Sequence, residues 1–557
     1  MAESYQNDSQ RTRLLKRKAS LWKERSTWDS HWKDISKVIL PMSGRFFESD
    51  RNDGRKRFNN IYDSTGTKAL NIMAAGLMAG MTSPARPWFR LATSDTDLME
   101  YEPVKIWLND VTTLMREVFA RSNTYRSLHS MYLELGAFGT AASIVMPDFD
   151  NVVHHHPLTV GEYAISTNAK GIVDTMYREF QMTVAQMVGK FGIENVSASV
   201  KNMFENGNYD TWVTVVHAIE PRTNRDTSKM DDKNMPFKSC YMEASKDNHD
   251  KMLRESGFKN FKVLCPRWNV TGGDMYGSSP GMESLGDIRQ LQHQQLRKGQ
   301  AIDYQVNPPL QVPAALKNQG ADRLPGGTTY TDMSVQGQGI RSLFEVNLNL
   351  QYLLEDIRDV RERIRSTFYA DLFMMLANDN RSGITATEVA ERHEEKLLML
   401  GPVLERLHNE LLNPLIDLTF DQLVEADVLP PIPQELEGID LKVEFVSMLA
   451  QAQRAVGVNS IDKLLTTVGG MAGMNPGVLD KINFDQVVDD YSDMLGVNPS
   501  LIVSDDEVAL IREQRAAQQQ QAQQMAMMQP MVDMAKTASE INPDVIDQFS
   551  GYSGIPL

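Results

Sequence analysis

The sequence predicts an α+β protein that is predominantly helical. Stretches before residue 140 and after residue 280 carry apolar side chains at helical spacing, whereas the stretch between them consists of short β-rich runs separated by turn residues. The chain has 557 residues, which is long for one hydrophobic core, so we expect roughly two to four subdomains. Its 41% apolar and 23% charged residues are typical of a folded protein.

Four helices are predicted in the N-terminal stretch. They are expected over residues 9–40, from Asp63 or Ser64 as the N-cap through 69–81, over 103–121 and over 124–137. Pro41 ends the first helix and Ser83-Pro84 ends the second. The exposed side of the first helix is basic, with Arg11, Arg13, Lys16, Arg17 and Lys18.

The middle of the chain changes to the two-residue period of strands. The β-rich runs are Ala141–Met146, Gly171–Phe180, Trp212–Ile219, Lys238–Glu243 and Lys262–Trp268. Short helices over 183–191 and 194–206 interrupt them. This middle part therefore gives the fold its β component.

The remaining chain is helical with defined interruptions. A helix over 280–305 ends at Asn307-Pro308-Pro309, because proline disfavours helix at the preceding residue and lacks a donor. The other segments are a strand-and-loop module over 308–346, a helix over 347–370, a break over 371–384, a helix from the capping box Thr385 and Glu388 to about 426, a Pro430–Pro433 linker, a compact helical domain over 442–515 and a Gln/Met/Ala-rich tail.

Charge and cysteine content narrow the function class. The formal net charge is −16, so a protein that grips DNA over its whole surface is excluded, because such a surface is basic. Two cysteines are too few for a disulfide framework, which favours a reducing compartment. No signal peptide is recognisable, and the longest apolar stretch, 69–81, is too short to span a bilayer. We expect a protein made in the cytosol, with no membrane contact.

No catalytic motif is found. The chain lacks a phosphate-binding loop and a Gly-x-Ser-x-Gly turn. The segment 63–67 is close to the phosphorylated Asp-Lys-Thr-Gly-Thr of cation-pumping ATPases, but those pumps need transmembrane helices, so a helix cap is the better interpretation. His154, His155 and His156 cannot converge on one metal ion, because successive strand side chains point to opposite faces. We expect no enzyme activity, no cofactor and no metal.

The helix over 347–370 carries a charge pattern that suggests assembly. Its apolar residues fall within about a third of the circumference. Arg358, Arg361 and Arg365 share one flank, and the acidic residues Glu355, Asp356, Asp359 and Glu362 lie mainly on the other. Cyclic head-to-tail contacts need two different, complementary surfaces, and these flanks would supply them. The alternative is an ordinary amphipathic helix with pairs at i and i+4.

Three groups of segments have an order and spacing typical of one protein family. They are Tyr62–Ala69 with Ala74–Leu77 and Ser83–Phe89; Tyr276–Gly281 leading to Gly286-Asp287; and Arg381–Glu395 followed by Gly401-Pro402 and Pro414. Through them the chain resembles the portal, or head-to-tail connector, proteins of short-tailed, podovirus-type bacteriophages. The resemblance covers nearly the whole chain.

The resemblance implies a portal fold in a ring of about twelve subunits with a central channel at one capsid vertex. It implies a wing over 1–275, stem helix 1 over 276–305, a clip over 306–346, stem helix 2 over 347–370, a tunnel loop over 371–384, a wing spine helix and linker over 385–438, a crown over 439–515 and a C-terminal segment over 516–557.

The implied function is a conduit through which double-stranded DNA is packaged and ejected without sequence recognition. The implied partners are the terminase large subunit, which hydrolyses ATP, tail adaptor or nozzle proteins, and the major capsid and scaffolding proteins. The protein would reside in the virion, at the capsid vertex and neck, and in the host cytoplasm during assembly. A different structural virion protein, a scaffold or a tail adaptor, is the alternative.

Two sets of residues are the predicted sites. The DNA-facing tunnel loop holds Met374, Met375, Asn378, Asp379, Asn380, Arg381, Ser382 and Gly383. The stem contacts between subunits or with the channel hold Arg358, Arg361, Arg365, Glu355, Asp359, Glu362, Arg297 and Lys298. Flexible methionines and one cation would let the loop touch DNA without holding it. An ordinary surface connection between helices is the other interpretation of the loop.

Overall fold

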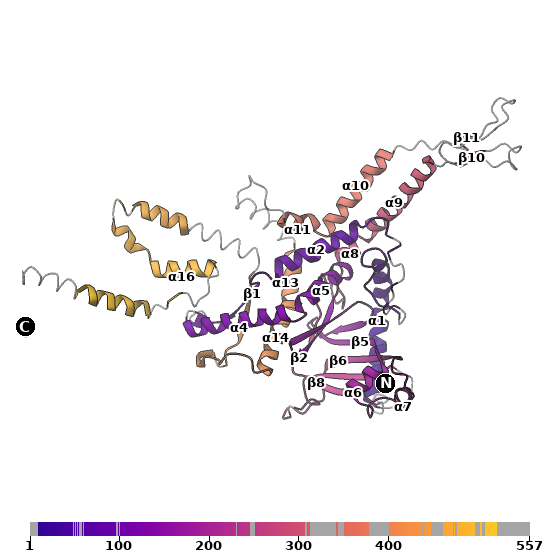
Figure 1. Cartoon of the computed structure of the whole chain (residues 1–557), viewed down its shortest axis with the longest axis horizontal. Helices are drawn as coiled ribbons and strands as arrows, with labels where there is room; N and C mark the ends of the chain where they lie inside the picture. The colour runs from indigo at the N-terminus through magenta and orange to yellow at the C-terminus, as the bar shows by residue number, and fades with distance from the viewer. Residues whose placement is uncertain are drawn as a thin grey trace, which may run out of the picture. The chain divides into compact units, whose positions relative to one another are not determined.

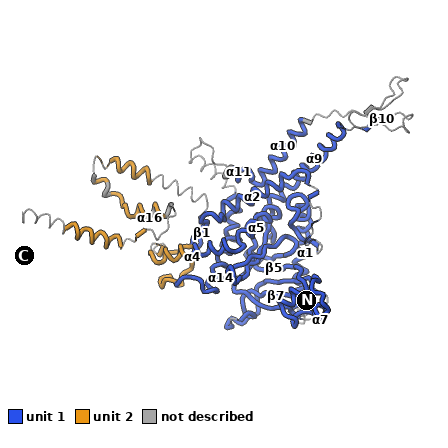
Figure 2. Tube along the Cα trace, in the orientation of Figure 1, with its two compact units in different colours: residues 1–90, 111–431, 443–449 blue, residues 91–110, 432–442, 450–557 orange. Residues whose placement is uncertain are grey.

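The computed structural model describes most of residues 9–520. Outside the description lie residues 1–8, 48–49, 51, 53, 55–57, 60, 96–97, 100, 230, 245–250, 307–308, 312–340, 343–349, 378–399, 437, 447–460, 472, 474–475, 496–501, 504–506 and 521–557. The chain divides into two compact units (Figure 2). Unit 1 comprises residues 1–90, 111–431 and 443–449, and unit 2 comprises 91–110, 432–442 and 450–557.

The four N-terminal helices form as predicted. They are α1 (Gln10–Val38), α2 (Thr65–Met81), α4 (Glu102–Arg121) and α5 (Thr124–Phe138). Ser9 caps α1 by accepting a hydrogen bond from the backbone N–H of Thr12. Helices α2 and α5 pack closely, because Gly136 has no Cβ, which would overlap the side chain of Met73.

An antiparallel five-stranded sheet forms the centre of the middle region (Figure 1). Its strands follow the order β4 (Tyr163–Thr167), β5 (Val173–Thr183), β6 (Trp212–Pro221), β7 (Phe237–Glu243) and β8 (Arg254–Phe258). Three of these strands match predicted β-rich runs, whereas β4 and β8 were not predicted. The predicted short helices are present as α6 (Val184–Phe191) and α7 (Ala198–Glu205).

Both faces of this sheet are covered by helices. On one face, Leu14 and Leu21 of α1 pack against Val216 and other side chains of alternate strand positions. On the opposite face, α6 and α7 pack through Met187 and Val200 against Val215 and its neighbours. Neighbouring residues on β6 therefore serve opposite layers, as the strand period requires.

A second sheet of three strands lies in unit 1, in the order β3 (Val152–Leu158), β2 (Ala142–Asp148) and β9 (Val263–Leu264). The strand predicted over Lys262–Trp268 is wrong in length, because only two residues of it join the ladder. Pro266 follows them and has no N–H to donate, which ends the pairing. Beyond it, Arg267 forms only an isolated bridge with Thr140.

The helix predicted to end near 426 is described from residue 401. It consists of α13 (Gly401–Leu407), the π-helical turn η4 (His408–Leu412) and α14 (Asn413–Glu425). The guanidinium of buried Arg267 donates to Glu410 Oε1 at 2.6 Å and to the carbonyl oxygen of Gly171 at 2.8 Å. The Arg267–Glu410 pair attaches the helical segment from α13 to α14 to the sheets. The capping box Thr385 and Glu388 lies outside the described residues.

A helical hairpin projects from the sheets (Figure 1). It contains α8 (Pro280–Glu283), α9 (Leu285–Val306) and α10 (Leu350–Thr367), with α9 and α10 packed side by side. The short strands β10 (Leu310–Gln311) and β11 (Arg341–Ser342) pair beyond the helix ends. The remaining strand-and-loop module predicted over 308–346 lies largely outside the described residues.

The break predicted over 371–384 begins differently from the expectation. Residues Ala370–Ala377 form helix α11, so the first half of the predicted loop is helical. The chain turns earlier, at Tyr369, whose φ of 54° lies in the left-handed region. Helix α11 is stabilised there because Leu372 and Phe373 are buried, and α11 packs against α2. Residues 378–384 lie outside the description.

The domain predicted as helical over 442–515 begins with a strand instead, β12 (Leu441–Phe445), whereas its described residues after 460 are mainly helical. It contains helices over 461–471 and 507–520, a 3-10 turn over Pro476–Lys481 and α16 (Phe484–Leu495). Arg512 pairs with both carboxylate oxygens of Asp485, at 2.6 and 2.7 Å. The hydroxyl of Tyr491 donates to Asp462 at 2.9 Å. Few described side chains here are buried, so the expected compactness is not seen among them.

Candidate functional site

Most of the apolar face of α10 is buried as its periodicity predicts, but Leu354 on that face is 40% exposed. Ile357, Val360, Ile364 and Phe368 are at most 2% exposed, and they pack toward α2, α9 and α11. Burying one such aliphatic side chain contributes about 1.5–3 kcal/mol. This face fixes which way the charged side chains of α10 point.

The charged residues of α10 fall into three groups around the helix. On the side toward α9, Arg363 pairs with Asp287 at 3.6 Å and Asp356 accepts a hydrogen bond from Gln294. On the side toward α2 lie Arg361 and Arg365. The outer face, away from the buried side chains, is acidic and exposed, with Glu355, Asp359 and Glu362. Basic and acidic sides thus exist, but Asp356 lies apart from the other acids.

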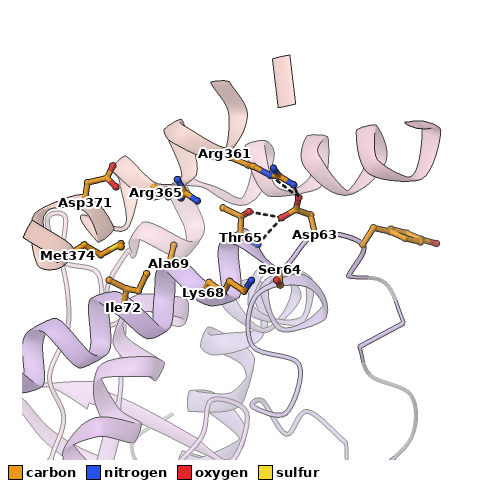
Figure 3. Close-up of a pocket in the computed structure, with 11 residues that line it drawn as sticks. Asp63, Ser64, Thr65, Lys68, Ala69, Ile72, Arg361, Arg365, Asp371 and Met374 are labelled. Carbon is orange, nitrogen blue, oxygen red and sulfur yellow. Dashed lines mark hydrogen bonds and ion pairs between the residues drawn. The ribbon is translucent and has the colours of Figure 1, made fainter. Parts of the chain in front are cut away.

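A cavity of about 570 Å³ lies where α10, α11 and the first turn of α2 meet (Figure 3). We call it the α2–α10 cavity. It is lined by Tyr62, Asp63, Ser64, Thr65, Lys68, Ala69, Ile72, Arg361, Arg365, Asp371 and Met374. Two of its cations, Lys68 and Arg365, pair with no carboxylate among the residues that the structure describes.

Asp63 organises the buried end of this cavity. Its Oδ1 accepts hydrogen bonds from the backbone N–H and hydroxyl of Thr65, and its Oδ2 accepts one from Arg361 at 2.7 Å (Figure 3). The same Oδ2 also accepts a hydrogen bond from Gln295 at 2.9 Å. Burial raises the pKa of Asp63, but the hydrogen bonds from Thr65 and Arg361 outweigh it, so the pKa lies below its usual value. The start of α2, where Asp63 was expected as a cap, is therefore held to α10 by the pair of Asp63 with Arg361.

The buried position of Asp63 supports the structural interpretation of segment 63–67. The Asp63 side chain is 6% exposed and accepts hydrogen bonds from Thr65, Gln295 and Arg361. A phosphorylated aspartate must reach its phosphate donor, and this carboxylate is engaged in holding α2 to α9 and α10.

The other predicted stem and loop residues take varied positions. On α9, Arg297 is exposed and donates to Gln300 at 3.1 Å, and Lys298 is half-buried. Arg358 is exposed on α10. Met374 is 44% exposed and lines the α2–α10 cavity. Met375 belongs to α11, but its side chain lies outside the described residues, as do Asn378, Asp379, Asn380, Arg381, Ser382 and Gly383.

The sequence missed two members of this site, Asp63 and Lys68, as neighbours of α10. Asp63 was recognised only as a helix cap. Its partner Arg361 is 298 positions away, and no local pattern reveals such a pairing. The excess of cations on one flank of α10 was the only signal that an acid should lie opposite.

The histidines of β3 behave as the strand period predicts. His155 is buried, whereas His154 and His156 share the other face with ring centroids 4.7 Å apart. Burial lowers the pKa of His155 to about 4. Among the described residues no group of three His, Cys, Asp or Glu side chains is placed to hold a metal ion. None of the described helices is both long and apolar enough to cross a bilayer.

Comparison with known proteins gives full-length matches. The chain is 59% identical over 552 residues to the "Probable portal protein" of Bordetella phage BPP-1, covering 98% of this chain and 99% of that protein. It is 48% identical over 553 residues to the "Portal protein" of Salmonella phage epsilon15, covering 99% of both. These matches agree with the resemblance drawn from the sequence.

Two solved neck structures match this chain distantly. The neck of an empty GTA particle with C6 symmetry gives a TM-score of 0.36 at 11% identity, covering 78% of this chain and 93% of that chain. The neck of a native GTA particle with C12 symmetry gives 0.33 at 11% identity, covering 73% and 85%. Likeness at this level supports no argument.

The family comparison is more specific. The model for the bacteriophage head to tail connecting protein matches residues 11–503, which include most of both units and the whole helical hairpin. With the two full-length relatives, this match confirms the resemblance that the sequence predicted. The chain belongs to the bacteriophage head to tail connecting protein family.

Proposed function

We propose that this chain is the subunit of a phage portal, a ring at one capsid vertex through which double-stranded DNA enters and leaves the head. The observation that carries the proposal is the 59% identity to a probable portal protein over 98% of this chain. At such identity and coverage two chains share their fold and their assembly surfaces. About twelve copies would form the ring.

The described elements can be assigned to the regions of a portal. The α+β part of unit 1, within 1–275, would be the wing, and α9 and α10 would be the two stem helices. The pair β10 and β11 would begin the clip, and α13 to α14 would be the wing spine. Residues 439–515 would be the crown. Since 370–377 is helical, the tunnel loop would be confined to 378–384.

Charge explains how such a ring would pass DNA without gripping it. Twelve copies at −16 carry roughly −190, and duplex DNA carries about one negative charge per 1.7 Å of its axis. The outer face of α10, with Glu355 and Asp359 exposed, would contribute to a repulsive surface. Isolated cations such as Arg297 would make transient phosphate contacts that carry no sequence information.

The proposed partners follow from this role. The clip would dock the terminase large subunit, whose ATP hydrolysis would drive packaging, and later the tail adaptor or nozzle proteins. The wing would face the major capsid and scaffolding proteins. The chain would be part of the virion at the neck and would be present in the host cytoplasm during assembly, and it would itself be no enzyme.

The size and shape of the purified protein test the proposal. A ring of about twelve chains of 62.8 kDa has a mass of about 0.75 MDa, and negative-stain images should show a central channel. Native mass spectrometry gives the copy number directly. A scaffold or tail adaptor, the second candidate, would give neither this mass nor an axial channel. A preparation that remains monomeric at high concentration, with intact secondary structure, would contradict the portal assignment.

A further inference from the structure

The α2–α10 cavity holds cations that the subunit itself leaves without acidic partners. Of the three cations in its lining, Arg361 is neutralised by Asp63. Lys68 and Arg365 are exposed and pair with no carboxylate within the described chain, and Asp371, also in the lining, forms an ion pair with neither. In Figure 3 the Arg365 side chain extends from α10 over the first turns of α2. The cavity is therefore open to one more negative group.

Unmatched acids lie on the same helix. On the outer face of α10, Glu355 and Glu362 are exposed and form no ion pair with any described residue, while Asp359 approaches Arg363 at 3.5 Å. Because Glu362 and Arg365 are three residues apart, they are separated by about 4.5 Å along the helix axis. One subunit thus presents a cationic recess and an unmatched carboxylate at nearly the same level.

Cyclic symmetry requires that groups in contact between neighbouring subunits lie at the same level along the ring axis. Neighbours in a ring are related by rotation alone, without a shift along the axis, so a residue can meet only residues of the next copy at its own height. Whatever the tilt of α10, the positions of Glu362 and Arg365 on the helix differ along the ring axis by no more than the distance between them. A head-to-tail contact must also join complementary groups, and Glu362 and Arg365 carry opposite charges.

We propose that in the ring the α2–α10 cavity of one subunit receives the Glu362 carboxylate of the neighbouring subunit, which pairs with Arg365 and Lys68. The occupant is a second copy of this chain, and the proposal rests on the proposed function, because it requires the ring. The contact would supply a charge pairing that fixes which surface of one subunit faces which surface of the next.

Two single charge reversals and their mixture test the pairing. Arg365→Glu places an acid opposite Glu362 of the next copy, and Glu362→Arg places two arginines opposite each other. Each variant alone should fail to form the ring of about 0.75 MDa and should remain a monomer of 62.8 kDa. The measurement is made at about 0.1 M salt, where charges still interact over about 10 Å. Mixed in equal amounts they should form rings, because alternation restores an opposite-charge pair at every interface.

The mixture separates contacts between subunits from effects within one. Since Arg365 and Glu362 are exposed, neither reversal should alter the far-UV circular dichroism of the monomer. Lys68→Glu gives a second variant of the same cavity, with the same expected loss. Lys170→Glu, an equal charge change on the exposed turn between β4 and β5, is the control and should assemble normally.

The outcomes are distinct. Intact rings from both single variants overturn the pairing, and so does a mixture of two folded variants that stays monomeric. A cavity that instead contacts DNA phosphates would leave both variants assembled and would lower only DNA retention, which also refutes the pairing. If the unaltered chain and Lys170→Glu are themselves monomeric, the portal proposal fails first.

Discussion

Glu134 is a carboxyl group buried inside unit 1. It lies on α5, is 5% exposed, and accepts hydrogen bonds from the hydroxyl of Thr159 at 2.8 Å and the N–H of Val160 at 3.3 Å. Burial raises its pKa to about 7 against the lowering effect of these bonds, and the nearby Glu162 raises it further. The group thus binds its proton more tightly in the folded chain than in the unfolded one.

A raised pKa in the folded state means that stability is lost as pH rises. The contribution of Glu134 is fully present below pH 4.5, its ordinary value, and is lost as pH increases through about 7. Glu134→Gln should remove this dependence. The free energy of unfolding of this variant should equal that of the unaltered protein at pH 4.5 and should be larger by about 1–3 kcal/mol at pH 8, so the variant is the more stable of the two there.

Urea denaturation at several pH values measures the Glu134→Gln difference. Glu117→Gln, at a carboxyl that is 57% exposed on α4, is the control and should show no such trend. If the stability of Glu134→Gln runs parallel to that of the unaltered protein across this range, folding does not raise the pKa of Glu134.

Asp63 shows the opposite sign. Its lowered pKa means that it stabilises the fold above its ordinary value of 3.8 and that this stability is lost as pH falls through the folded value. Asp63→Asn leaves Arg361 without its charged partner and should cost about 1–3 kcal/mol at pH 7. Chemical denaturation gives the value, and Asp371→Asn, on an exposed acid of the same cavity, should change it by less than about 0.5 kcal/mol. Equal losses from the two variants would show that the Asp63 network adds no stability.

At the scale of elements, α11 depends on one small residue of α2. A Cβ at Gly76 would overlap the ring and Cβ of Phe373, whereas at Gly80 on the same helix nothing lies within 4 Å. The closeness of α2 and α11 therefore relies on a missing side chain. The contact between Gly76 and Phe373 therefore helps to fix the position of α11, which directly precedes residues 378–384.

Two glycine-to-alanine changes on α2 should act in opposite directions. Gly80→Ala should stabilise the protein by about 0.5–1 kcal/mol, because alanine is the better helix former. Gly76→Ala gains the same propensity but displaces Phe373, with a net loss of about 1–3 kcal/mol. Thermal unfolding measures both, and hydrogen exchange should show faster exchange in α11 for Gly76→Ala alone. Equal protection of α11 in the two variants would mean that α11 is not held through this contact.

Elements whose signal lies in their own residues could be predicted. The long helices α1, α5 and α10 follow from apolar periodicity, and the buried face of α10 matches its sequence pattern except at the exposed Leu354. By contrast, β4 and β8 were not predicted, because they are short strands at the two edges of the sheet and their own residues carry little signal. The helix α11 was taken for a loop because Asn, Asp and Gly follow it closely, yet burial against α2 extends the helix to Ala377.

The site was predictable in kind and not in its contacts. Periodicity separates the basic and acidic sides of α10, but it cannot show that Arg361 is neutralised by an acid 298 positions earlier. Arg361 thus stabilises its own subunit, while Arg365 remains available to a neighbour. Side-chain pairing between distant segments depends on the packing of three helices, which no local pattern encodes.

At the scale of the whole molecule, the tunnel loop is tested in the assembled head. Replacing residues 378–383 by a Gly/Ser linker should leave rings intact, because the loop lies beyond the last residue of α11 and the packed faces of α10 and α11 are unchanged. It should reduce the genome content or retention of heads, measured as packaged DNA per particle. The control is a Gly/Ser replacement of equal length at the exposed turn 223–228. Full genome content and infectivity from the loop variant would leave these residues as a simple connection.

The order of the strands along the chain determines when each strand can pair during synthesis on the ribosome. Strand β2 pairs with β3 immediately, but its other edge waits for β9, and Arg267 then waits for Glu410. During synthesis at about 5–20 residues per second, the unpaired edge of β2 stays open for several seconds or longer. An exposed strand edge is a template for pairing with another chain. Aggregation of nascent chains, which grows with expression rate, should therefore limit the yield of this protein before its final stability does.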